Sequence, residues 1–278
     1  MAAKADVVVL AVGFNASSES EGGDRSFELP PGQEQLIEQV AALGKKTIVM
    51  MTSGGSVDVS AWKDKVQGIF ETWYAGEEGG DAAARLLFGE DDPSGHLPIS
   101  WEKKVTDNPS YSHYYPDPGT NKIVYGEGVF VGYRGYEHTH VEPQYPFGYG
   151  LSYTTFGFSK LASKETGEGR FTVTFDVTNT GKRAGATVAQ VYVSPGSSSI
   201  ERPAKELKGF ERVMLQPGES KHVTLALDPR SFSYYDVKAA AWKADAGTYT
   251  LLLGDSSQNL PQRATVQLSK TLTTSISE

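Results

Sequence analysis

The sequence of 278 residues contains no cysteine. This absence excludes structural disulfides, thiolate metal sites and a cysteine nucleophile. An excess of positive charge is also lacking, because 26 Lys and Arg stand against 34 Asp and Glu, for a net charge of -8. A chain of this charge repels phosphates at long range, so we expect no nucleic-acid partner.

Long apolar runs are absent as well. Residues 7–12 form one of the longest, far short of the ~20 residues that a membrane-spanning helix needs, so we expect a soluble chain without a membrane partner. Residues 1–6 carry one Lys and no apolar stretch, and we do not expect a signal peptide there. The composition suits a bacterial cytoplasm, a periplasm or secretion, and leaves localisation open.

The first hundred residues alternate between strand and helix patterns. Residues 6–13 and 46–51 are continuous apolar runs typical of parallel strands buried on both faces, and the first is expected to be a central strand. A third strand is expected at 66–73. Helical patterns cover 33–43 and 79–88, each followed by a glycine suited to end a helix. This alternation predicts a parallel α/β sheet.

Functional loops of such a sheet lie beyond the carboxyl ends of its strands. Here these loops are residues 13–27, 52–58 and 74–79.

The second half of the chain has a different pattern. Residues 91–153 are rich in Pro, Gly and aromatic residues, and this aromatic content predicts an ordered segment wrapped over the first domain rather than a flexible linker. Beyond residue 156, apolar and polar residues alternate in runs separated by turn signals. The clearest runs are 171–178, 187–193, 221–227 and 247–253. Five to seven such strands predict a β-sandwich.

The first loop carries three carboxylates within six residues, Glu19, Glu21 and Asp24. One interpretation is a glycosidase acid/base, which must give a proton to a leaving oxygen and take one back from water. A second is a solvated acidic loop without a catalytic role. A third is a calcium site that uses these carboxylates and the Ser20 hydroxyl, although Arg25 would compete for the same oxygens.

Aromatic and histidine side chains leave further alternatives open. Trp73 and Tyr74, at the end of the third expected strand, either stack against a sugar ring or pack in a core. His138 and His140 would point to one side of an expected strand, which makes them the only metal candidate among the five histidines.

Five sequence blocks, in the same order, make the chain resemble glycoside hydrolase family 3. The resemblance covers essentially the whole chain. The blocks are Ser-Glu-Gly-Gly-Asp-Arg at 20–25 with Leu-Pro at 29–30, Trp-Tyr-Ala-Gly-Glu-Glu-Gly-Gly at 73–80, Pro-Ser-Gly-His-Leu-Pro at 93–98, Tyr-Gly-Glu-Gly-Val-Phe-Val-Gly-Tyr-Arg at 125–134, and Pro-Phe-Gly-Tyr-Gly-Leu-Ser-Tyr-Thr at 146–154.

This resemblance implies the C-terminal part of a retaining, exo-acting β-glucosidase. Residues 1–106 would be the end of the α/β sandwich domain, a partial parallel-sheet domain. Residues 107–154 would be an aromatic linker, and 155–278 a fibronectin type III-like β-sandwich. In the family, a preceding (β/α)8 barrel supplies the nucleophilic aspartate and most contacts to glucose. These 278 residues leave no room for such a barrel, so we expect the isolated chain to be inactive.

By position in the motif, the resemblance assigns Glu21 as the general acid/base. Glu19 would tune the loop electrostatically, and Asp24 and Arg25 would pair with each other or brace the loop. Ser20, Trp73 and Tyr74 complete the residues expected at or near the substrate.

The expected partners are a β-glucoside or short β-linked gluco-oligosaccharide, the barrel portion as a domain or separate chain, and a second copy of this chain in a homo-oligomer. No cofactor and no metal is implied. Two alternatives remain open: a related β-glycosidase such as a β-xylosidase, and a non-catalytic accessory module of a carbohydrate-active protein.

Overall fold

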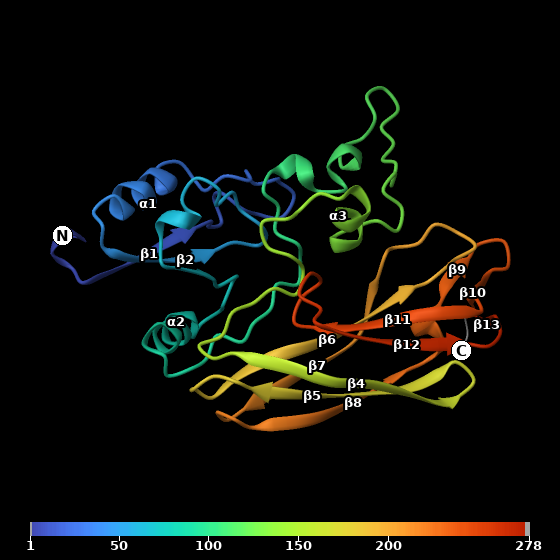
Figure 1. The fold of residues 1–278 in the computed structure, drawn as a ribbon. Helices are drawn as coiled ribbons and strands as arrows, with labels where there is room; N and C mark the ends of the chain where they lie inside the picture. The colour runs from blue at the N-terminus through green and yellow to red at the C-terminus, as the bar shows by residue number, and fades with distance from the viewer. Residues whose placement is uncertain (1, 276–278) are drawn as a thin grey trace. The chain divides into compact units, whose positions relative to one another are not determined.

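The computed structural model of the protein describes residues 2–275 (Figure 1). The chain folds as two compact units. The first comprises Met1–Asp91 and Trp101–Asn108, and the second comprises Asp92–Ser100 and Pro109–Glu278. None of the helices in the described residues has the length and apolar character needed to cross a membrane.

The first unit is built on a parallel sheet of three strands. They are β1 (Val7–Gly13), β2 (Lys46–Thr52) and β3 (Gly68–Glu71), in the spatial order β1-β2-β3. The unit also contains α1 (Gln33–Ala41), which packs on β1 and β2, and α2 (Gly79–Phe88), which ends at Gly89 in the left-handed conformation. The predicted parallel α/β unit is confirmed.

Two details of this sheet differ from the predictions. The expectation that the first strand is central is wrong for the described residues, because β1 pairs with β2 alone and exposes 46% of both Val7 and Val9. The central strand is β2, where Met51 is fully buried. The third strand is shorter than expected: it covers Gly68–Glu71 and ends before Trp73, whose φ of +50° is outside the extended region.

The second unit is an antiparallel β-sandwich, as predicted. A four-stranded sheet has the order β12-β11-β6-β7, a three-stranded sheet the order β4-β5-β8, and a small third sheet the order β13-β10-β9. The strands are β4 (Phe156–Gly167), β5 (Arg170–Asn179), β6 (Gly185–Pro195), β7 (Glu206–Leu215), β8 (Ser220–Leu227), β9 (Tyr234–Asp236), β10 (Ala241–Ala244), β11 (Gly247–Gly254), β12 (Gln262–Leu268) and β13 (Leu272–Thr274).

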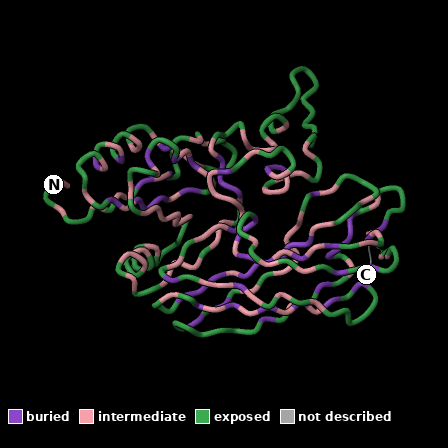
Figure 2. The backbone as a smooth tube through the Cα atoms, in the orientation of Figure 1, coloured by how far each residue is buried: buried purple, intermediate pink, exposed green. Residues whose placement is uncertain are grey.

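Alternation along the strands creates the core of the sandwich. Every second residue of β5 is buried, and Phe175 and Val177 are fully so. Leu251 and Leu253 of β11 are fully buried in the same cluster, and the strands in Figure 2 accordingly alternate in burial. Removal of these side chains from water is the main force that holds the two sheets together.

The aromatic segment before the sandwich is ordered. It contains α3 (Tyr133–Thr139), whose Tyr133 ring stacks on Phe147 at 4.9 Å and whose Tyr133 hydroxyl accepts a 2.8 Å hydrogen bond from the Leu207 N–H of β7. Glu137 of α3 forms an ion pair with Lys205. The segment is therefore fixed against the sandwich within the second unit.

The expected strand around His138 and His140 is wrong, because these residues end α3. His138 stacks on Phe130 at 4.0 Å, and His140 has φ +55° where the helix stops. Across residues 2–275, no group of three or more His, Asp or Glu side chains is arranged to hold a metal ion.

Short 3-10 turns complete the structure. They are Ala2–Lys4, Lys63–Lys65, Val105–Asp107, Tyr111–His113 and η5 (Pro229–Phe232).

Candidate active site

The three predicted loops follow the carboxyl ends of β1, β2 and β3 within the first unit. Gly13, the last residue of β1, lies in register with Thr52, the last residue of β2. A Cβ on Gly13 would lie 2.1 Å from the Thr52 carbonyl oxygen, so only glycine allows the two strand ends to come this close. The first two loops therefore start side by side.

Glu21 lies at the tip of a tight turn in the first loop. Ser20 and Gly23 form a β-bridge, and Gly22 adopts φ +80°, which side chains other than glycine rarely allow. The Glu21 side chain is exposed, and within residues 2–275 its carboxylate makes no hydrogen bond or ion pair. Its oxygens are available for proton transfer to a ligand.

Glu19, two residues earlier, has a different environment. Its Oε2 accepts a 2.7 Å hydrogen bond from the Tyr74 hydroxyl and one of 3.2 Å from the Gly54 N–H. Its Oε1 lies 3.4 Å from Nε of Arg25, and only 21% of the side chain is exposed. Glu19 thus contacts all three loops, and its carboxylate is already occupied by protein donors.

Arg25 anchors the other side of the turn. Its guanidinium donates to the carbonyls of Ser26 at 3.0 Å and Ser56 at 2.7 Å, and it lies 4.7 Å from the centre of the Phe14 ring. Its ion pair is with Glu19. A Cβ on Gly55 would lie 3.0 Å from the Arg25 guanidinium, so the second loop is shaped around this side chain.

Tyr74 and Trp73 lie at the start of the third loop. Tyr74 is 57% exposed and therefore is not a core residue, and its hydrogen bond to Glu19 raises the pKa of its phenol. Trp73 is half-buried, and its backbone N–H donates a 2.8 Å hydrogen bond to Oε1 of Glu71. The Tyr74 ring is thus exposed to solvent and lies next to the first loop.

Glu71, at the end of β3, is a carboxylate beside these loops that the sequence analysis did not single out. Burial raises the pKa of its carboxyl to about 7, against the opposing effect of hydrogen bonds from Trp73 and Ser53 and of the positive charge of Arg25. The Ser53 N–H and hydroxyl lie 3.3 and 3.1 Å from its two oxygens. The available signal was a carboxylate at the carboxyl end of an otherwise apolar strand.

The predicted site residues thus gather at one edge of the sheet. Glu19 contacts both Arg25 and Tyr74, and Glu21 extends from the turn that these three residues hold in place. A carboxyl group held in this way, with open access, can donate a proton to a bound oxygen and later accept one.

Comparison with known proteins gives two family matches. Residues 1–153 match the glycosyl hydrolase family 3 C-terminal domain, and residues 187–257 match the fibronectin type III-like domain. The predicted resemblance and the class of the second unit are therefore confirmed.

Curated relatives align over nearly the whole chain. The exo-α-(1→6)-L-arabinopyranosidase of Bifidobacterium breve is 41% identical over 96% of this chain and 35% of the relative. The thermostable β-glucosidase B of Acetivibrio thermocellus is 40% identical over 98% of this chain and 36% of the relative. The chain thus spans about a third of the length of the curated relatives that it matches.

Solved structures show the same relationship. A family 3 β-glucosidase of Bifidobacterium adolescentis superposes with a TM-score of 0.92 at 41% identity, over 96% of this chain and 40% of that one. The β-glucosidase 3B of Thermotoga neapolitana, solved in complex with α-D-glucose, gives a TM-score of 0.92 at 37% identity, over 99% of this chain and 39% of that one.

Proposed function

Because this chain belongs to glycoside hydrolase family 3 and forms a C-terminal region of such enzymes, we propose that it is part of a retaining, exo-acting β-glucosidase. In this proposal, Glu21 is the general acid/base. The observation that carries it is the contrast between two neighbouring carboxylates: Glu19 is bound by three protein donors, while Glu21 is exposed and makes no polar contact within residues 2–275.

The proposed reaction has two steps. In the first step, an aspartate attacks the anomeric carbon and forms a covalent bond to the sugar, while the bond from that carbon to the glycosidic oxygen breaks. The protonated Glu21 carboxyl donates its proton to the departing oxygen. The Glu21 carboxylate then removes a proton from the water that attacks the same carbon and releases the aspartate. Glu19, Arg25 and Tyr74 hold the turn in place through both steps.

The nucleophilic aspartate is proposed to come from a (β/α)8 barrel outside the described residues. A retaining enzyme needs its two carboxyl groups about 5–5.5 Å apart on opposite sides of the sugar bond. Glu19 is poorly suited to act as the nucleophile, because Arg25, Tyr74 and Gly54 already hold its oxygens. We therefore expect no glycosidase turnover from this chain alone.

A terminal β-D-glucosyl group is the proposed substrate unit. β-Glucosidases among the relatives, together with solved family members bound to glucose, support it. The arabinopyranosidase, at 41% identity, supports a related pyranose as the second candidate, in line with the β-xylosidase alternative. The site described above holds the leaving oxygen rather than the sugar ring, so it does not separate these sugars.

The test requires both halves of the site. The chain replaces the matching region of the Acetivibrio thermocellus β-glucosidase B, so that the rest of that enzyme supplies the missing parts, and Glu21→Gln is compared with Glu34→Gln, at a glutamate of α1 outside the three loops. We expect Glu21→Gln to lower kcat/KM on an alkyl β-glucoside by about 100-fold or more, and by much less on a dinitrophenyl β-glucoside, whose leaving group needs no proton. Unchanged turnover of the alkyl glucoside would refute the assignment.

Native mass spectrometry separates this function from the accessory-module alternative. A 30.0 kDa species without activity, together with an inactive fusion that still binds oligosaccharide, would favour the accessory role. Activity restored by the barrel portion favours the enzyme.

A further inference from the structure

The second unit contains a cavity of about 510 Å³, lined by none of the residues of the site already described. It is lined by α3, by the chain leading into β7, and by the region from η5 to β10. Its volume lies within the roughly 300–1,000 Å³ of small-molecule sites. All of its lining residues belong to this one unit.

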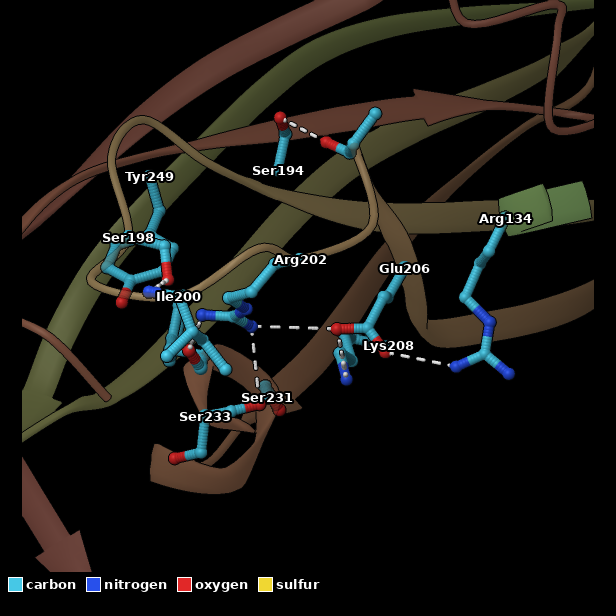
Figure 3. A network of polar contacts seen from close by, with 12 residues as sticks. Arg134, Ser194, Ser198, Ile200, Arg202, Glu206, Lys208, Ser231, Ser233 and Tyr249 are labelled. Atoms are coloured by element: carbon cyan, nitrogen blue, oxygen red, sulfur yellow. Dashed lines mark hydrogen bonds and ion pairs between the residues drawn. The ribbon is translucent and has the colours of Figure 1, made fainter. Parts of the chain in front are cut away.

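Three cations surround a single carboxylate in this cavity. Arg134, Arg202 and Lys208 each place a nitrogen 3.5 Å from an oxygen of Glu206, and Figure 3 shows them converging on it. Charge-assisted hydrogen bonds are normally about 2.7–2.9 Å long, so these contacts are loose. One negative charge against three positive charges leaves a net positive site around Glu206.

The other two carboxylates of the lining are engaged elsewhere. Asp228 caps η5, where its Oδ1 accepts 3.0 Å hydrogen bonds from the N–H and the hydroxyl of Ser231. Glu201 lies 3.8 Å from His138, with 71% of its side chain exposed. A fourth cation, Arg230, adds to the positive charge and stacks 4.1 Å from the centre of the Trp242 ring.

Two of the cations retain unused donors. Arg202 donates to the carbonyls of Phe232 at 2.9 Å and Ser233 at 3.2 Å, so the backbone fixes it. Arg134 and Lys208 have only their long contacts to Glu206 within the described residues. Lys208 is also largely buried, and this burial lowers the pKa of its ammonium.

Aromatic rings form another wall of the same cavity. Tyr235 and Trp242 lie edge to face, 5.5 Å apart, and Tyr234 is also part of the lining. Flat apolar rings beside hydrogen-bond donors suit a pyranose, which has both C–H faces and hydroxyl groups.

We propose that this cavity binds an anionic sugar, a pyranose carrying a carboxylate or phosphate group. Its oxyanion accepts hydrogen bonds from Lys208 and Arg134, and its ring lies against Tyr235 and Trp242. The site is separate from the proposed hydrolytic function, since it uses none of the residues around Glu21.

Calorimetry and ligand-observed NMR on the 278-residue chain test this with four probes: D-glucuronate, glucose 6-phosphate, glucose and inorganic phosphate. We expect glucuronate, glucose 6-phosphate or both to bind, and added salt to weaken this binding. Glucose and phosphate should each bind at least tenfold more weakly, because each supplies only half of the contacts. The two anionic sugars distinguish a carboxylate from a phosphate site.

Variants of two lining residues test whether the anionic sugar binds in this cavity. Lys208→Met keeps the packed stem and removes the charge, and Arg134→Gln removes a more exposed cation. Each should weaken binding about tenfold, as expected for one charge-assisted hydrogen bond. The matched control is Lys221→Gln, a lysine that also pairs with a glutamate but lies outside the cavity, and it should bind as the unchanged chain does. Thermal unfolding checks that each variant is folded.

Three results would overturn the proposal. The first is that neither anionic sugar binds at millimolar concentration. The second is that phosphate or glucose binds as tightly as the anionic sugars. The third is that both cavity variants, once shown to be folded, bind as tightly as the control.

Discussion

The Tyr74 hydroxyl donates a 2.7 Å hydrogen bond to Oε2 of Glu19 and so joins the loop after β3 to the loop after β1. The two residues are 55 positions apart in the sequence. Glu19 also accepts from the Gly54 N–H of the loop after β2, so one carboxylate connects all three loops. These contacts hold the turn that carries Glu21.

Tyr74→Phe removes this hydrogen bond and leaves the ring in place. We expect the first loop to open more often, which raises the rate of cleavage after Glu19 by a glutamate-specific protease about threefold to tenfold, the effect of one hydrogen bond. The control is Tyr125→Phe, at a tyrosine that is 81% exposed. Equal cleavage rates in the two variants would show that the hydrogen bond does not restrain the loop.

Glu71→Gln changes how stability depends on pH. The pKa of Glu71 is raised to about 7 in the folded chain, so the folded state holds its proton more strongly than the unfolded state does. This group therefore favours folding below the ordinary pKa of glutamate and loses that contribution as pH rises through about 7. From this group alone, we expect unfolding of the unchanged chain to cost about 1–2 kcal/mol less at pH 8 than at pH 5, after allowance for solvent screening.

Urea unfolding at the two pH values measures this effect. Glu71→Gln should lack this share of the pH dependence, while Glu28→Gln, at an exposed glutamate, should retain it. Identical pH profiles for all three proteins would contradict the burial of a protonated Glu71.

Gly13→Ala tests the contact between the ends of β1 and β2. The added Cβ would lie 2.1 Å from the Thr52 carbonyl oxygen at a residue with φ +134°, so the strand ends must separate. We expect the free energy of unfolding to fall by about 2–4 kcal/mol. Gly80→Ala in α2, where a Cβ meets nothing within 4 Å, should instead raise it by about 0.5–1 kcal/mol. Denaturant unfolding compares the two, and equal effects would refute the close approach.

Asn179→Ala tests a buried polar network in the sandwich. Asn179 is fully buried and donates to the carbonyls of Arg183 at 2.7 Å and Leu215 at 3.1 Å, while its Oδ1 accepts from the Thr154 hydroxyl at 2.7 Å. Alanine would remove these hydrogen bonds from a buried site, at an expected cost of about 2–4 kcal/mol. Thr178→Ala, at an exposed hydroxyl on the same strand, should cost under about 1 kcal/mol. Denaturant unfolding measures the free energy of unfolding of each variant. An equal loss in the two variants would contradict the importance of this network.

Local patterns in the sequence predicted most of the fold. The apolar face and terminal glycine of α2 define its limits, and the alternation in β5 identifies the residues of the sandwich core. Helix α3 was not predicted, because its sequence Tyr-Arg-Gly-Tyr-Glu-His-Thr contains a glycine and several weak helix formers. Contacts of Tyr133 and Glu137 with the chain around β7, which no local pattern reports, hold it in place.

The candidate site was predictable in its residues but not in its contacts. Glu19, Glu21 and Arg25 stand out as a charged loop after a strand. The ion pair of Arg25 with Glu19, and the contact of Tyr74 with the same carboxylate, depend on how three loops meet in space. Glu71 was not predicted, because the raised pKa of its carboxyl results from burial, and the burial of a single residue at a strand end does not follow from its sequence position.

The turn that carries Glu21 is held on both sides, by the three contacts of Glu19 before it and by the backbone hydrogen bonds of Arg25 after it. Most of the backbone entropy of this loop is therefore lost when the chain folds. Under the proposed function, substrate binding then has to fix only the rotamers of the Glu21 side chain, which costs about 1–2 kcal/mol at most. If Glu21 is the acid/base as we propose, we expect the same restraint to limit how far its carboxyl group can follow leaving groups of different size, so that this short turn restricts the range of aglycones accepted.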